Sequence, residues 1–166
     1  SVIFWQIDRT GKVRTGKEMQ YNPEDGHRIK GGQTSVVNWI HSILKKQRVL
    51  AEDWQLSQCL FGEHLLKTHP DKVVVLVESE KSAVIGSALF PGYVRLAAGG
   101  KSQLREEKLR VLSGRTLLLF PDADAYAEWK ERADGMTFCK VMVSDLIEKN
   151  ATPEQKAAHI DIADWI

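Results

Sequence analysis

The chain has 166 residues, enough for one domain of ordinary size or for a compact domain with a small one appended. Its composition, 43% hydrophobic and 27% charged, excludes disordered and collagen-like classes. A formal net charge of +1 excludes a strongly basic nucleic-acid coat but leaves room for a local basic patch. No apolar run approaches the length of a membrane span, and two cysteines, Cys59 and Cys139, favour a reducing compartment. We therefore expect a cytoplasmic protein without membrane contact.

The first 70 residues are expected to form a small β-rich and helical region. Apolar, β-prone residues open the chain, and amphipathic patterns with helix-capping residues follow the turn-rich stretch after them. The expected elements are a strand at Val2–Ile7, a turn at Asp8–Gly11, a second strand from Val13, a helix after Gly31 and Gly32 with the apolar stripe Val36, Ile40, Ile43 and Leu44, and a helix from about Asp53 to His69.

From Lys72 onward, strands and helices alternate, which is typical of a mostly parallel sheet flanked by helices. Val73–Val77 is an uninterrupted apolar run, as expected of a strand covered on both faces. The other expected elements are strands at Val94–Ala97, Thr116–Phe120 and Phe138–Val143 and helices at Glu80–Leu89, Ser102–Leu112, Ala125–Arg132 and from the capping box at Thr152 to the end. The sequence thus predicts an α/β fold, with a small α+β subdomain at 1–70 preceding the sheet domain at 71–166.

Acidic residues follow two of these strands, at the edge where open parallel sheets bind ligands. Asp122 and Asp124 stand two apart directly after a buried strand, so both carboxylates can point to the same side. Glu78 leaves the end of another strand toward the same crevice. Hard oxygen donors of this kind suit Mg²⁺. The alternative is that the two aspartates cap the helix that begins near Ala125.

A glycine pair follows the second strand of the predicted sheet. Gly99-Gly100-Lys101-Ser102 resembles the end of a phosphate-binding P-loop, but Arg95 stands where that loop needs its first glycine, which argues against a nucleotide hydrolase. Two glycines before a helix can still present backbone N–H groups to a phosphate. Lys101 is therefore a candidate phosphate contact.

The combined pattern resembles the Toprim domain of primases, topoisomerases and some nucleases. Val75–Ala83, with its glutamate at the strand end, resembles the first motif of phage-type helicase-primases, and Leu118–Asp124 resembles the second. The family's glycine and aspartate in the first motif are replaced by Ser79 and Ser82. Three further segments resemble parts of bacterial replicative primases: Val2–Val13 the small β subdomain, Leu60–His64 the segment before the glutamate, and Asp161–Asp164 a late acidic motif.

This resemblance implies a Toprim-like sheet and Mg²⁺-dependent nucleotidyl transfer, with Mn²⁺ as a substitute metal. The implied activity is primer synthesis on single-stranded DNA from nucleoside triphosphates during replication of a mobile element, with other replication proteins as partners. Glu78 would act as general base or acid, Asp122 and Asp124 would bind the metal, and Asp161 or Asp164 would be auxiliary ligands. Basic residues would contact nucleic acid: Lys12, Arg14, Lys17, Arg28 and Lys30 along the template path and Lys101 at a phosphate.

Two other functions fit the same residues. A nuclease would use these acids to direct water instead of a sugar hydroxyl. A non-catalytic nucleic-acid-binding module is favoured by Ser79 and Ser82, whereas the presence of three convergent carboxylates favours an enzyme. The basic residues have a simpler alternative as well, a solvated surface.

Overall fold

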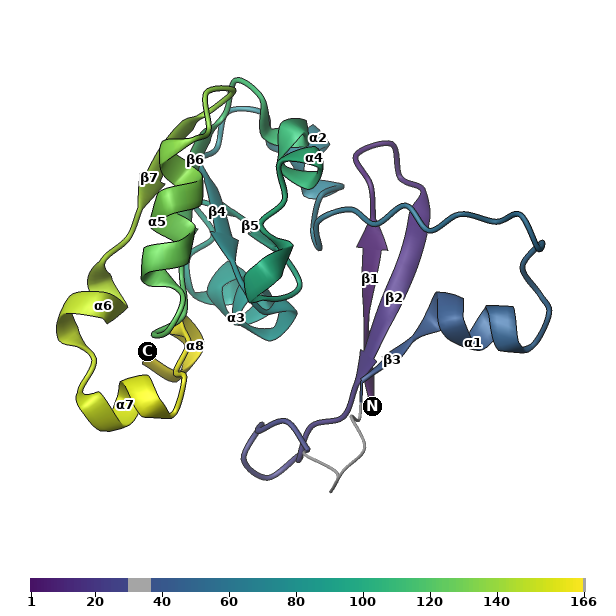
Figure 1. Ribbon diagram of the computed structural model, residues 1–166, viewed down its shortest axis with the longest axis horizontal. Coiled ribbons are helices and arrows are strands. Elements are labelled where there is room, and N and C mark those ends of the chain that lie inside the picture. Colours follow the sequence, from purple (N-terminus) through teal and green to yellow (C-terminus); the bar gives the residue numbers. More distant parts are fainter. Residues whose placement is uncertain (30–36, 166) are drawn as a thin grey trace.

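The computed structural model describes residues 1–29 and 37–165 and has a mixed α/β architecture (Figure 1). Its larger sheet has four strands, all parallel, in the order β5-β4-β6-β7. The strands are β4 Val74–Val77, β5 Val94–Ala97, β6 Thr116–Phe120 and β7 Lys140–Val143. The next two strands in the chain are added on opposite sides of β4, so the strand order reverses there. This confirms the predicted parallel sheet, with a switch point between β4 and β6.

Helices connect these strands and cover both faces of the parallel sheet (Figure 1). They are α2 Leu65–Thr68, α3 Glu80–Leu89, α4 Glu106–Leu109, α5 Tyr126–Asp134, α6 Leu146–Asn150, α7 Pro153–Ala157 and α8 Ile162–Trp165, with 3-10 turns η1 Lys101–Gln103 and η2 Arg110–Leu112. Helix α3 begins and ends as the sequence predicts. Ser79 caps it, since its hydroxyl accepts a hydrogen bond from the backbone N–H of Ser82.

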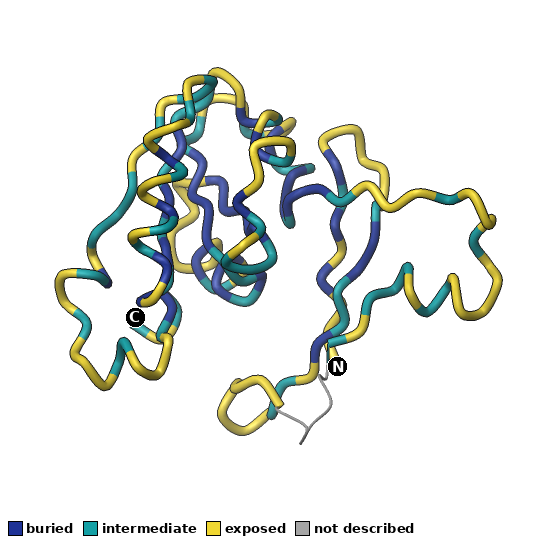
Figure 2. Tube along the Cα trace, in the orientation of Figure 1, coloured by how far each residue is buried: buried dark blue, intermediate teal, exposed yellow. Residues whose placement is uncertain are grey.

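Two apolar layers hold the sheet between its helices, and its strands β4 and β5 are buried at every position (Figure 2). Alternate residues of each strand point to opposite faces. Leu76 and Leu119 belong to the larger layer, which Trp129 of α5 closes without any exposed surface. Val75 and Val77 belong to the smaller layer, which Ala83 of α3, Ile147 of α6 and Ile162 of α8 cover.

The N-terminal region is a three-stranded sheet with one helix. β1 Val2–Ile7 pairs antiparallel with β2 Val13–Met19, which pairs with the short β3 Asn38–Trp39, and α1 Ile40–Lys46 follows directly. The predicted strands are confirmed. The predicted beginning of the helix, at residues 31–36, lies outside the described residues.

This hairpin packs against the segment that leads into the parallel sheet. The rings of Phe4 and Phe61 meet edge to face, with centroids 5.6 Å apart. The Gln6 side chain accepts a hydrogen bond from the backbone N–H of Cys59 at 3.3 Å. The expected boundary near residue 70 stays a prediction; Leu60, from before it, packs in the core of the parallel sheet.

Three helix predictions were wrong in extent. The chain from Asp53 to His64 is not helical, and of the helix expected from Asp53 to His69 only α2 forms. Phe61 instead makes a β-bridge with Ala97, and Gly62 turns the chain with φ +81°. The helix expected at 102–112 is divided into η1, α4 and η2. The capping box at Thr152 is present, but His159, at φ 53°, separates α7 from α8.

No helix within 1–29 or 37–165 combines the length and the apolar character needed to cross a bilayer.

Candidate functional site

The sheet topology brings Glu78 and Asp122 to the same edge. β4 and β6 are neighbours in parallel register, with Val77 opposite Phe120, so Glu78 and the Pro121-Asp122 pair leave the sheet side by side. This is the carboxyl edge at the switch point, where α/β sheets bind ligands. The predicted convergence of these two acids is present in the structure.

Glu78 and Asp122 are short of compensating charge. Among the described residues neither carboxylate has an ion-pair partner, and Glu78 Oε2 is buried without a hydrogen-bond partner. Burial and the charge of Asp124 raise the pKa of Glu78, against the opposing influence of Lys101 and a hydrogen bond from Asp122. The pKa of Asp122 is raised to about 9, first by burial and then by the negative charges of Glu78 and Asp161. The charges of Asp124 and Asp164 add to this rise less strongly. At neutral pH the pair therefore retains a proton.

Asp124 is neutralised by Lys101 instead. Lys101 Nζ donates to Asp124 Oδ2 at 2.9 Å and to the Asp124 backbone carbonyl at 2.7 Å. His159 Nδ1 lies 3.3 Å from the same Oδ2. Burial would raise the pKa of Asp124, but the hydrogen bond and charge of Lys101 outweigh it and lower that pKa. The lysine is held in place by Trp129, whose indole N–H donates to the Lys101 carbonyl at 3.2 Å.

The alternative that the aspartates cap the following helix is not supported. The N-cap residue of α5 is Ala125, and no side chain caps the helix there. The Asp122 contact to this turn is made by its backbone carbonyl, which accepts from the Ala125 N–H at 3.0 Å. Neither carboxylate therefore serves as the helix cap, and that of Asp124 is held by Lys101.

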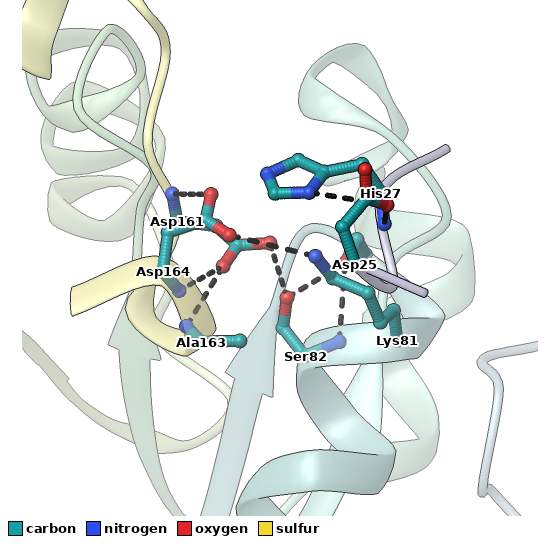
Figure 3. Close-up of polar contacts among 8 residues, drawn as sticks. Asp25, His27, Lys81, Ser82, Asp161, Ala163 and Asp164 are labelled. Carbon is teal, nitrogen blue, oxygen red and sulfur yellow. Dashed lines mark hydrogen bonds and ion pairs between the residues drawn. The ribbon is translucent and has the colours of Figure 1, made fainter. Parts of the chain in front are cut away.

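Asp161 and Asp164 reach the cluster from the C-terminal segment and meet the first turn of α3 (Figure 3). Ser82 Oγ donates to Asp161 Oδ2 at 2.5 Å, and the backbone N–H groups of Ala163 and Asp164 donate to Asp161 Oδ1 at 2.7 and 3.0 Å. Asp164 Oδ1 lies 3.5 Å from Lys81 Nζ. Asp161 is therefore buried and caps α8, and the hydroxyl of Ser82 holds its carboxylate, whose charge helps to raise the pKa of Asp122.

Of the six basic residues predicted to contact nucleic acid, Lys17 and Lys101 reach the acidic edge. Lys17 Nζ donates to Glu80 Oε2 at 3.0 Å and to the carbonyl of Gly99 at 3.3 Å. Glu80, whose direction the sequence did not reveal, is fully buried and faces this lysine. In the sequence, Glu80 could be noticed only because it stands two residues after Glu78. Its partner Lys17, from the N-terminal hairpin, is evident only in the structure.

The other basic residues lie apart from the acids. Lys12 is exposed in the turn of the hairpin, and Arg14 pairs with Asp8 at 2.6 Å. Arg28 is exposed near the opposite end of the hairpin, in a β-bridge with Tyr21. Lys30 lies outside the described residues. Lys12, Arg14 and Arg28, the described residues of this group, do not form one patch.

The glycine pair does not present a helix N-terminus. Gly99 and Gly100 have φ values of +92° and +151°, which side-chain-bearing residues rarely adopt. The helix that follows, η1, has three residues and no full α-helical turn. The helix end at which a phosphate contact is expected is thus a single 3-10 turn, and Lys101 faces Asp124.

The donor set fits a divalent cation in its electrostatics. Among the described residues, no group of three or more His, Cys, Asp and Glu side chains is placed to hold a metal ion. The buried Glu78 Oε2 without a partner and the proton retained by Asp122 nevertheless mark a cluster that lacks positive charge. Carboxylate oxygens are the ligands that Mg²⁺ prefers.

A family model described as "Domain of unknown function (DUF6371)" matches residues 1–123. The match includes the hairpin, Glu78 and Asp122 and stops just before Asp124. No curated protein matches the chain. Because the model covers well over half of the sequence, the chain belongs to the DUF6371 domain family.

Proposed function

We propose that this chain carries a Mg²⁺-dependent site for nucleotidyl transfer on nucleic acid, of the kind that Toprim primases use for primer synthesis. The observation that carries the proposal is the Glu78–Asp122 pair at the switch point, half-buried, with Glu78 Oε2 buried and without a hydrogen-bond partner among the described residues. A site of this kind is poised to bind a metal ion and an anionic substrate together.

Asp122 would hold the ion, and Asp124 would join it if Lys101 moved from it to a substrate phosphate, which leaves Glu78 as the proton acceptor. When bound, Mg²⁺ or Mn²⁺ would neutralise charge on the transferring phosphoryl group and orient its oxygens. The raised pKa of Asp122, due first to burial, means that this carboxyl must release its proton before it can serve as a ligand.

The protein residues have separate tasks in this proposal. Burial, and then the charge of Asp124, raise the pKa of Glu78, which suits a general base that accepts a proton from an attacking hydroxyl. Lys101, exposed over about a third of its side chain, can exchange Asp124 for a phosphate oxygen. Asp161 acts indirectly: it fixes α8 to α3 and adds negative charge beside Asp122.

Single-stranded DNA and nucleoside triphosphates are the proposed partners, in replication of a mobile element. Cytoplasmic location is part of the proposal and is supported by the two free thiols. Burial raises the pKa of the Cys59 thiol to about 12, which leaves it unreactive.

A non-catalytic nucleic-acid-binding module is the second candidate, and the Ser82–Asp161 contact favours it. The hydroxyl of Ser82 stands where the Toprim motif has an acid, and it donates to one oxygen of Asp161, the carboxylate nearest to it. A nuclease remains the enzymatic alternative, since the same acids can direct water.

The first experiment is a calorimetric titration of Mg²⁺ and Mn²⁺ into the wild type and into Asp122→Asn/Asp124→Asn. We expect binding by the wild type and its loss in the double variant. Asp145→Asn, which removes an exposed carboxylate paired with Lys149, is the control and should bind like the wild type. Equal binding by all three would disprove the metal site.

Activity assays then separate the candidates. Nucleotide incorporation on a single-stranded template indicates a primase, strand cleavage indicates a nuclease, and DNA binding without either indicates the module. Glu78→Gln should lower the rate at least ~100-fold if Glu78 is the general base. An undiminished rate in this variant would rule out that assignment.

A further inference from the structure

Arg95 is a buried positive charge without an anionic partner. It lies in β5 and is 7% exposed, which is exceptional for an arginine. Its side chain makes no hydrogen bond or ion pair with any described residue, and its Nε is buried without a partner. Burial lowers the pKa of its guanidinium. Proteins seldom retain an unpaired buried charge without a use for it.

The surrounding residues leave room for this guanidinium. Gly86 of α3 is essential to the space, because a Cβ there would lie 2.7 Å from both Cδ and Nη1 of Arg95. The rings of Phe90 and Tyr93 lie 5.0 and 5.9 Å from the guanidinium carbon, close enough for cation–π attraction. The arginine is therefore held in a defined position that still lacks an anion.

Arg95 lines an apolar groove of about 240 Å³ on the α3–α8 side of the parallel sheet. Cross-strand pairing places it beside Val75, which is beside Leu118, so these two residues form the floor. Phe90 and Tyr93, both more than 40% exposed, stand at one wall, with Leu146, Ile162 and Trp165 also lining the groove. Arg95 is the single charged residue among the described residues that line it.

We propose that this groove binds a small apolar carboxylate, with an aromatic or branched aliphatic body against the sheet and its carboxylate on Arg95. A guanidinium matches a carboxylate in charge and in its paired hydrogen-bond geometry. The apolar floor and the aromatic wall would bury the body of the ligand. The site is separate from the acidic edge and does not depend on nucleotidyl transfer.

The groove suits a monoanion better than nucleic acid. A phosphodiester chain carries a charge at every nucleotide and is bound by several basic residues, whereas this groove offers one. Its small volume also fits one compact ligand. Binding of oligonucleotide in preference to carboxylate would overturn the assignment.

The test uses 3-phenylpropanoate and its neutral amide as probes, titrated into the full chain and followed by nuclear magnetic resonance. We expect the acid to bind at least ~10-fold more tightly than the amide, because a charge-assisted hydrogen bond is lost in the amide. The Arg95 Nε–H and Trp165 indole resonances should shift with the acid. Equal affinities, no binding of the acid up to its solubility limit, or shifts confined to other regions would overturn the proposal.

Substitutions test whether the preference for the acid over the amide depends on Arg95. Arg95→Met should abolish the preference for the acid, whereas Arg110→Met should retain it. Arg110 is a matched control because its guanidinium also lies over a ring, that of Phe138 at 5.8 Å. If Arg95→Met does not fold, Tyr93→Leu replaces it and should weaken the acid and the amide alike. Retention of the preference in Arg95→Met, or unchanged affinities in Tyr93→Leu, would contradict the assignment.

Discussion

Asp122 lowers the stability of the folded protein when its carboxyl group ionises. Its pKa is raised to about 9 by burial and by the negative charges around it, against an ordinary value of 3.8. Between these pH values the folded state binds more protons than the unfolded state, so stability falls as pH rises from about 4 to about 9. This cost is expected of residues kept for binding and not for folding.

Asp122→Asn should therefore stabilise the protein above neutral pH. We expect its free energy of unfolding at pH 8 to exceed that of the wild type by ~2 kcal/mol, with the difference shrinking toward pH 4. Urea denaturation across this pH range measures it. Asp145→Asn, in which an exposed acid with a lowered pKa is removed, should give no such gain. A wild type more stable than Asp122→Asn at pH 8 would show that ionisation of Asp122 does not destabilise the folded state.

At the scale of elements, the segment before β4 depends on one backbone conformation. Gly62 has φ +81°, and a Cβ added there would lie 2.9 Å from the carbonyl of Arg95. This close approach allows Phe61 to exchange backbone hydrogen bonds with Ala97 at 3.0 and 3.1 Å. The tertiary contact explains why residues with helical spacing run extended here.

Gly62→Ala should weaken this junction. We expect a loss of ~2 kcal/mol in the free energy of unfolding, because alanine must adopt a left-handed conformation against a neighbouring backbone. Gly92→Ala is the matched control, since nothing lies within 4 Å of the added Cβ and its φ is ordinary. Thermal and urea denaturation of the two variants test this expectation, and equal stabilities would contradict it.

At the scale of the whole molecule, Lys17 and Glu80 join the N-terminal hairpin to the parallel sheet. Their side chains are 12% and 2% exposed, and the ion pair is 3.0 Å long. Lys17 also donates to the carbonyl of Gly99, so one ammonium group ties β2 to the first turn of α3 and to the end of β5. Apolar contact between Phe4 and Phe61 reinforces the same interface.

Lys17→Met should destabilise the protein by ~3 kcal/mol, because Glu80 is left as a buried, uncompensated charge. Lys17→Met/Glu80→Leu should recover most of this loss, which a double-mutant cycle in urea measures. Arg110→Met, which breaks an exposed pair with Glu106, should cost less than ~1 kcal/mol. A loss in Lys17→Met no larger than in Arg110→Met would show that the pair does not join the two sheets.

The sequence by itself determined the parallel sheet, α3 and the position of the main acids. Runs such as Val73–Val77 are apolar at every position, and this pattern depends only on burial of both faces of a strand. Chain order and the right-handed crossover rule then place Glu78 and Asp122 at one edge. These inferences need only local patterns and general topology.

Only the tertiary structure decided which charges meet. Lys17 on Glu80, Ser82 on Asp161 and Lys101 on Asp124 join residues 63, 79 and 23 positions apart, and their side-chain directions follow from packing. The extended path through Phe61 and the unpaired charge of Arg95 were likewise set by neighbours distant in sequence. Charge pairing depends on a few ångströms of three-dimensional placement, which no local pattern encodes.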